Sequence, residues 1–115
     1  MKQKEITIQG KQYPAVFDMQ TMMNFEEIAN KSFFDSKFNT INDRVALIVA
    51  AAYAADKDSD ITVETVIGNK DWDAVKQIIS AFAIISELMG QFFNIPEIEK
   101  KDNLEQTEGE GKPKN

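Results

Sequence analysis

Three aspartates spaced two residues apart come closest to a metal-binding motif. Asp56, Asp58 and Asp60 occupy the first, third and fifth positions of a calcium-loop pattern, whose carboxylates bind the ion. The sixth position, which requires glycine, is Ile61, and the twelfth, which requires glutamate, is Ile67. Because two required residues are replaced by isoleucine, we expect a solvated loop between helices rather than a metal site.

Two other charged features raise the question of a chemical role. Glu26 and Glu27 are adjacent, but neighbours on a helix diverge by about 100°, whereas paired-carboxylate chemistry needs two groups that converge on one substrate atom. We therefore expect a charged helix face. Arg44 is the only arginine, and we expect its guanidinium to pair with Asp43 or with another surface carboxylate.

The composition excludes most catalytic machinery. The chain has no histidine and no cysteine, so it lacks the usual general base at neutral pH, thiolate metal ligands and every Ser-His or Cys-His pair. The glycine-lysine stretches at Gly10-Lys11 and residues 109–112 lack the spacing of a phosphate-binding loop. We predict a protein that is not an enzyme and has no catalytic residue, cofactor or metal.

The net charge of −6 disfavours nucleic acid as a partner, because phosphate binding draws on clustered Lys and Arg. The first ten residues contain no apolar stretch of about 7–15 residues, which a signal peptide requires. Its longest apolar run covers residues 45–55, whereas a membrane span needs roughly 17–25 residues. We therefore expect a cytoplasmic protein that has neither a membrane nor a nucleic acid as its partner.

An alternating, β-branched segment at residues 5–9 predicts a first strand. Gly10-Lys11 indicates a tight turn, and residues 11–17 indicate the returning strand of a hairpin. Pro14 has no amide hydrogen to donate, which favours an edge position in the sheet.

Capping residues then mark the helices. Asp18 is suited to cap a helix over residues 19–30, and Thr40 to open a second helix, with Asp43 in a capping-box position. The second helix is apolar almost all round, so we expect it to be central or covered on two sides. Residues 62–67 predict a short helical turn that ends at Gly68-Asn69, and Asp71 begins a long helix from Trp72 to about Phe93.

The last helix carries two adjacent apolar seams. The first contains Trp72, Val75, Ile79, Phe82, Ser86, Met89 and Phe93, and the second contains Ile78, Ala81, Ile85, Leu88 and Phe92. The helix is either a central core helix or one whose second apolar seam is free for an oligomer or partner contact. The connector over residues 31–39 has three further aromatic residues that something must cover. We predict partner binding by Phe33, Phe34, Phe38, Ile78, Ile85, Leu88 and Phe92.

The overall prediction is an α+β, mostly helical fold in which an N-terminal β-hairpin is followed by three to four helices. Residues 1–96 form one globular domain in this interpretation. Residues 97–115 carry few apolar side chains and many charges, and they cannot bury enough surface to offset the entropy of ordering. We expect them to form a flexible, disordered acidic tail.

The opening segment and the order of elements carry a family resemblance. Residues 5–27 (EITIQGKQYPAVFDMQTMMNFEE) combine a strand, a Gly-Lys turn, a second strand and a helix near the acidic pair Glu26-Glu27. The apolar middle helix, the turn at residues 62–64 and the long last helix continue the order. Over roughly residues 3–95 the chain resembles the tail assembly chaperones of long-tailed bacteriophages.

The resemblance implies a concrete function. Such chaperones bind the long, helical tape measure protein before the tail tube polymerises around it, keep it soluble, and often form multimers. It implies a non-catalytic protein in the cytoplasm of a bacterial host, with the tape measure protein as partner and a possible homo-oligomer. Two other classes stay open: a self-assembling structural or adaptor protein of a phage or bacterial complex, and a small carboxylate-dependent enzyme.

Overall fold

The computed structural model describes residues 2–94 of the chain. Its first element is an antiparallel hairpin of β1 (Gln3–Ile8) and β2 (Lys11–Val16), in which Ile8 pairs with Lys11 and Ile6 with Tyr13. The loop is therefore Gln9-Gly10, one residue earlier than the predicted turn. Both loop residues have positive φ, 54° and 77°, as a two-residue type I′ turn requires.

Alternation along the two strands gives the hairpin one apolar face. Ile6 and Ile8 of β1 are fully buried on the same side as Tyr13 and Ala15 of β2. Pro14 lies opposite Glu5 in a sheet of only two strands. Counting from the Ile8–Lys11 pair, this is a pair without mutual hydrogen bonds, so the missing amide hydrogen costs the ladder nothing.

Side-chain caps set the start of each α-helix. The helices are α1 (Met19–Ala29), α2 (Ile41–Ala55), α3 (Val63–Ile67) and α4 (Trp72–Phe92), and a short 3₁₀ helix, η1 (Phe33–Asp35), follows α1. Asp18, Thr40, Thr62 and Asp71 each accept a hydrogen bond from a backbone amide three residues later. The sequence predicts the caps at Asp18, Thr40 and Asp71, and it predicts a helical turn over residues 62–67. Asp18 and Thr21 complete a reciprocal capping box.

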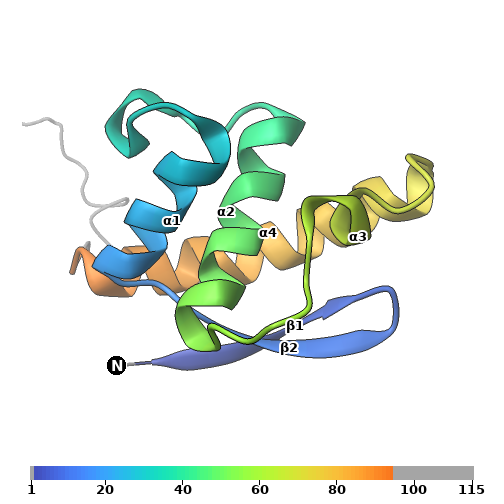
Figure 1. Ribbon diagram of the computed structural model, residues 1–115, viewed down its shortest axis with the longest axis horizontal. Helices are drawn as coiled ribbons and strands as arrows, with labels where there is room; N and C mark the ends of the chain where they lie inside the picture. Colours follow the sequence, from blue (N-terminus) through green and yellow to red (C-terminus); the bar gives the residue numbers. More distant parts are fainter. Residues whose placement is uncertain (1, 95–115) are drawn as a thin grey trace, which may run out of the picture.

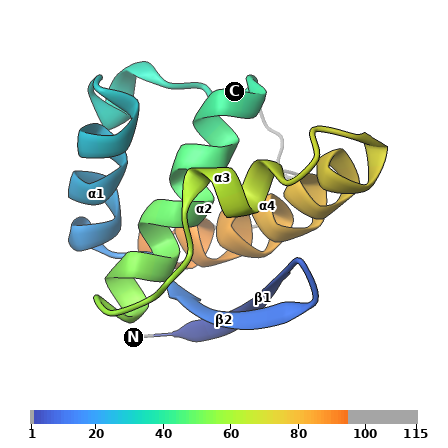
Figure 2. The same ribbon diagram turned by 45° about the vertical axis from the view of Figure 1, so that its right-hand side comes forward.

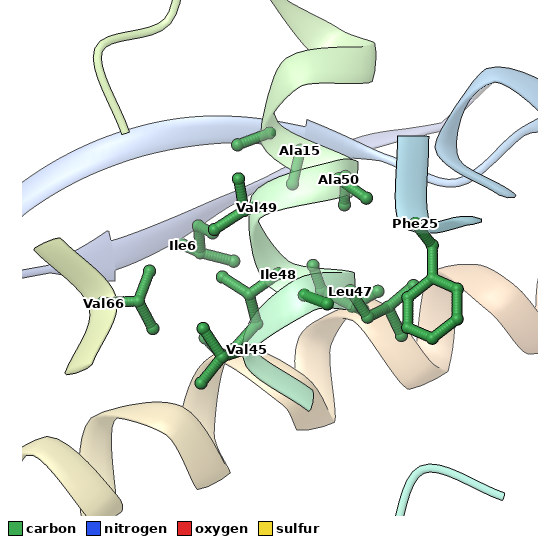
Figure 3. Close-up of a cluster of buried hydrophobic side chains, with 14 of the residues drawn as sticks. Ile6, Ala15, Phe25, Val45, Leu47, Ile48, Val49, Ala50 and Val66 are labelled. Carbon is green, nitrogen blue, oxygen red and sulfur yellow. The ribbon is translucent and has the colours of Figure 1, made fainter. Parts of the chain in front are cut away.

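Helix α2 lies at the centre of the molecule. It contacts α1, α3, α4 and the hairpin, and every residue from Val45 to Ala52 is buried. Figures 1 and 2 show α1 beside α2, α4 crossing behind it, and the hairpin below. The close-up in Figure 3 shows α2 side chains directed toward each neighbour; its labelled residues are Ile6, Ala15, Phe25, Val45, Leu47, Ile48, Val49, Ala50 and Val66. The expectation of a central helix is confirmed.

The observed architecture is the predicted α+β, mostly helical fold with an N-terminal hairpin. The polar linker between α2 and α3 and the short helix α3, ended by Gly68 at φ 51°, also lie where the sequence places them. The predicted flexible tail, residues 97–115, lies outside the described residues.

Candidate functional site

Two of the three aspartates of the calcium-loop pattern accept hydrogen bonds, one from a distant lysine and one from within the loop. Asp60 Oδ2 accepts a hydrogen bond from Lys11 Nζ at 2.8 Å, and Asp56 Oδ1 accepts one from the amide of Asp58 at 3.0 Å. Within residues 2–94, no group of three or more His, Cys, Asp or Glu is arranged to hold a metal ion. The lysine also holds the pKa of Asp60 below its usual value, while burial raises the pKa of Tyr13.

Arg44 departs from its predicted pairing. Its Nε donates to the carbonyl oxygen of Phe38 at 2.6 Å, and its guanidinium lies 4.4 Å from the ring centroid of Phe82. The expected Asp43 partner is wrong because the arginine turns toward the connector and α4. This stacking and the carbonyl contact fix the connector against α4.

Asp43 is one of two buried polar or charged side chains in the described part of the chain. Its carboxylate accepts from Lys31 Nζ at 2.6 Å and from Ser36 Oγ at 2.7 Å. The predicted capping box is thus only half formed: Thr40 accepts from the amide of Asp43, but the carboxylate faces the connector. The Lys31 ammonium holds the pKa of Asp43 below its usual value.

Glu26 binds the connector and does not form a pair with Glu27. Its Oε2 accepts a hydrogen bond from the amide of Phe33 at 2.9 Å. Together with Asp43 and Arg44, this contact holds both ends of the segment between α1 and α2. The charged residues that looked chemically interesting in sequence therefore position a loop that is rich in phenylalanine.

All eight phenylalanines of the chain form one connected aromatic network. Phe33 lies at its centre, with ring centroids 5.7 Å from Phe17, 5.8 Å from Phe25 and 5.3 Å from Phe38. Such tilted and edge-on pairs add about 0.5–1.5 kcal/mol each beyond the area they bury. The network links the segment before α1, the connector and α4; its members are Phe17, Phe25, Phe33, Phe34, Phe38, Phe82, Phe92 and Phe93.

The network reaches the surface at three members. Phe34 is 74% exposed, Phe92 45% and Phe93 40%. Phe34 and Phe93 both pack on the buried ring of Phe33, at 5.5 and 6.5 Å, and Phe92 lies 5.2 Å from Phe93. We call Phe34, Phe92 and Phe93 the aromatic patch. Its rings pack on the buried rings of Phe17 and Phe33, so a ligand would meet a preorganised surface.

Two of the three connector residues predicted to bind a partner are instead core residues. Phe33 is 5% exposed and Phe38 9%, because the 3₁₀ turn and the Arg44 contact direct both rings inward. Only Phe34 points to solvent. The local sequence gave no means of separating three phenylalanines within six residues.

The second seam of α4, from which four residues are predicted to bind a partner, is mostly buried. Ile78, Ile85 and Leu88 are at most 2% exposed and pack in the core. Within that seam only Phe92 is exposed. In the first seam Trp72 is 66% exposed and Ile79 48%, whereas Phe82 and Met89 are half-buried against the core. The three buried residues are therefore not available to a partner in this structure.

Trp72, Ile79 and Phe93 are surface residues that the sequence analysis did not select. All three belong to the first apolar seam of the predicted helix, but nothing in the local sequence tells which residues of the two seams are exposed. A hollow of about 360 Å³ lies between the starts of α2 and α4 and the end of α3. Ile41, Ile67 and Val75 form its apolar lining.

None of the helices in the described part of the chain is long and apolar enough to span a bilayer. Comparisons of the chain with protein-family models, with curated proteins and with solved structures give no match.

Proposed function

We propose that this chain is a non-catalytic phage tail assembly chaperone that binds the tape measure protein and keeps it soluble during tail morphogenesis. The observation that carries the proposal is the aromatic patch of Phe34, Phe92 and Phe93, which are 74%, 45% and 40% exposed. Large aromatic side chains exposed together are typical of protein-binding surfaces. The resemblance of the opening segment to this family supplies the identity of the client.

The physical chemistry of the patch suits a helical client. An amphipathic helix places apolar side chains at every third or fourth position, and these can lie across neighbouring rings. Met19 and Met23, which are 68% and 54% exposed on α1, add pliable apolar surface that adapts to varied helices. The net charge of −6 favours solubility of the complex.

In this proposal the charged side chains Glu26, Asp43 and Arg44 have a structural role and not a catalytic one. Glu26, Asp43 and Arg44 each contact the connector that carries Phe34. Their contacts hold the connector on both sides of Phe34, which lowers the entropy that binding at this residue would otherwise cost.

Co-expression with the tape measure protein encoded in the same genome tests the proposal. We expect this chain to raise the soluble fraction of the client and to co-purify with it. Phe34→Ala combined with Phe92→Ala should abolish both effects while the variant stays folded. Ile41→Ala is the matched control, because Ile41 is 47% exposed but is outside the aromatic network.

A client that stays insoluble, or a complex that survives the double substitution, would overturn the assignment of the patch. If the purified protein instead forms a defined multimer and persists in finished particles, the alternative of a self-assembling structural protein is favoured.

A further inference from the structure

The side of α1 that is turned away from the core carries a shallow hollow of about 530 Å³. In Figures 1 and 2, α1 lies at the edge of the molecule, with α2 on its inner side. The lining combines one exposed thioether, three carboxamides and two carboxylates. We call it the α1 hollow; it is lined by Gln20, Met23, Asn24, Glu26, Glu27 and Asn30.

The α1 hollow adjoins the aromatic patch. Glu26 connects the two, because its Oε2 accepts a hydrogen bond from the amide of Phe33, the residue next to Phe34, at 2.9 Å. Met19 and Met23 are both exposed and lie one helical turn apart on the same side of α1. The stretch from Met19 to Asn30 is roughly 17 Å long at 1.5 Å per residue. A helix that crosses α1 and reaches Phe34 therefore has a continuous surface to lie on.

The charge of this surface has one sign. Helix α1 contains two glutamates and no basic residue. In the connector that follows, Lys31 is already paired with Asp43, whose Oδ2 lies 2.6 Å from its Nζ, and the charges of Asp35 and Lys37 balance one another. Neither lysine of the connector lines the α1 hollow. The two carboxylates of the hollow are therefore an uncompensated negative charge.

The fold itself gives no reason for Glu27. The residue lies in the last turn of α1, where the helix dipole disfavours a carboxylate. Its side chain is exposed, and none of the ion pairs in the described part of the chain involves it. Glu26, by contrast, contributes to the structure through the amide of Phe33. The charge of Glu27 is thus one that the helix disfavours and that stays available to a ligand.

From these observations we infer, on the basis of the proposed function, that the client segment bound at this surface is a basic amphipathic helix. Its apolar side chains lie on the aromatic patch and on Met19. A lysine or arginine of the helix enters the α1 hollow, where its aliphatic stem packs on Met23. Its cationic group contacts the carboxylates of Glu26 and Glu27 in charge-assisted hydrogen bonds.

The chemistry of the surface disfavours other clients. An acidic helix would place its carboxylates against Glu26 and Glu27, and like charges that face one another across an interface are unfavourable. A segment without charges would bury these two carboxylates without a partner, which costs their hydration. At the other edge of the aromatic patch, Lys2 lies beside Phe92 in a separate hollow. The basic side chains of the client therefore belong at the α1 edge of the site.

Two synthetic peptides test the charge preference with the full-length protein. Each is a fluorescein-labelled amphipathic helix of about 18 residues, or five turns, with leucine on one face. One carries lysine on the polar face and the other carries glutamate at the same positions. In fluorescence anisotropy titrations we expect the lysine peptide to bind at least about tenfold more tightly. Raising the NaCl concentration from about 50 to 300 mM should weaken its binding, because salt screens exposed charges.

Charge reversal locates the contact. Glu27→Lys should weaken the lysine peptide at least about tenfold, because the substitution removes an attraction and adds a repulsion. Glu5→Lys is the matched control: it makes the same change in net charge at an exposed position on β1, and it should leave the affinity within about twofold. Glu27→Lys should not lower the thermal midpoint, since a lysine is favourable at the end of a helix.

Equal affinities for the two peptides would overturn the inference, and so would equal effects of Glu27→Lys and Glu5→Lys. The peptides contain no tape measure sequence, so this result is separate from the test of the proposed function. If the tape measure protein is retained in full by Glu27→Lys, the inference fails and the proposed function stands. If the lysine peptide binds through Glu27 but the tape measure protein is not recruited, the proposed function fails and the charge preference of the surface stands.

Discussion

Phe33 and Phe34 are adjacent, chemically identical residues that the structure places in opposite environments. Phe33 is 5% exposed at the centre of the aromatic network, and Phe34 is 74% exposed. Replacing each in turn by alanine removes the same atoms one residue apart in the chain. Each variant is therefore the matched control of the other.

The expected magnitudes follow from the contacts that each ring makes. Phe33 packs against five other phenylalanines, and removing a buried phenylalanine ring typically costs about 3–5 kcal/mol. Phe34 has one aromatic neighbour, Phe33 at 5.5 Å, and remains mostly in water, so its loss should cost less than about 1 kcal/mol. The difference corresponds to more than about 10 °C in thermal midpoint for a domain of this size.

Urea unfolding followed by far-UV circular dichroism measures both free energies of unfolding. Circular dichroism is preferable to tryptophan fluorescence, because Trp72 is 66% exposed in the folded state. If Phe34→Ala costs as much as Phe33→Ala, the ring of Phe34 is covered in solution and the aromatic patch is wrongly placed. If Phe33→Ala costs less than about 1 kcal/mol, the network does not stabilise the fold as argued.

Three further substitutions test local features of the fold. Gly68→Ala should cost about 1–3 kcal/mol in urea unfolding, because its φ of 51° is strained for a residue with a Cβ; Gly90→Ala, at a glycine without positive φ, is its control. Thr21→Val should cost about 1–3 kcal/mol in the same assay, since it leaves a capping amide and a buried carbonyl without their partner. The pKa of Asp43 is lowered by Lys31, so the native state binds fewer protons than the unfolded state. The ion pair therefore adds its full contribution to the free energy of unfolding above about pH 4, and this contribution is lost as pH falls through the lower native pKa of Asp43. Asp43→Asn should accordingly flatten the acid side of a plot of stability against pH. An unchanged acid limb in Asp43→Asn would contradict the assigned ion pair.

Local signals were sufficient for the elements of this fold. The caps at Asp18, Thr40, Thr62 and Asp71 are decided by a side chain and the amide three residues away, which is information within one helical turn. The uniform apolar character of residues 45–52 likewise indicated a central helix before any neighbour was known.

The hairpin loop shows where local information becomes insufficient. The sequence correctly places Gly10 in the turn. The loop nevertheless begins one residue earlier than predicted, because Gln9 adopts a φ of 54°. Gln9 is held there by distant groups: its amide donates to Gln77 of α4 and its side chain to the carbonyl oxygen of Thr65. No pattern within the hairpin records those contacts.

The partners of the charged residues were also decided by packing. Asp43 and Arg44 are neighbours in the chain, yet one turns to Lys31 and the other to Phe38 and Phe82. Their separation depends on how the connector folds back over α2, which local propensity does not determine.

The sequence by itself determined that α4 is a long capped helix with two apolar seams. Only the tertiary structure decided which seam is enclosed, because α2 and the hairpin pack against Ile78, Ile85 and Leu88 and leave Trp72 and Ile79 in solvent. Both seams satisfy the same helical periodicity, so the hydrophobic effect favours burying either one. The choice follows from the positions of the neighbouring elements, and it leaves Trp72 and Ile79 exposed.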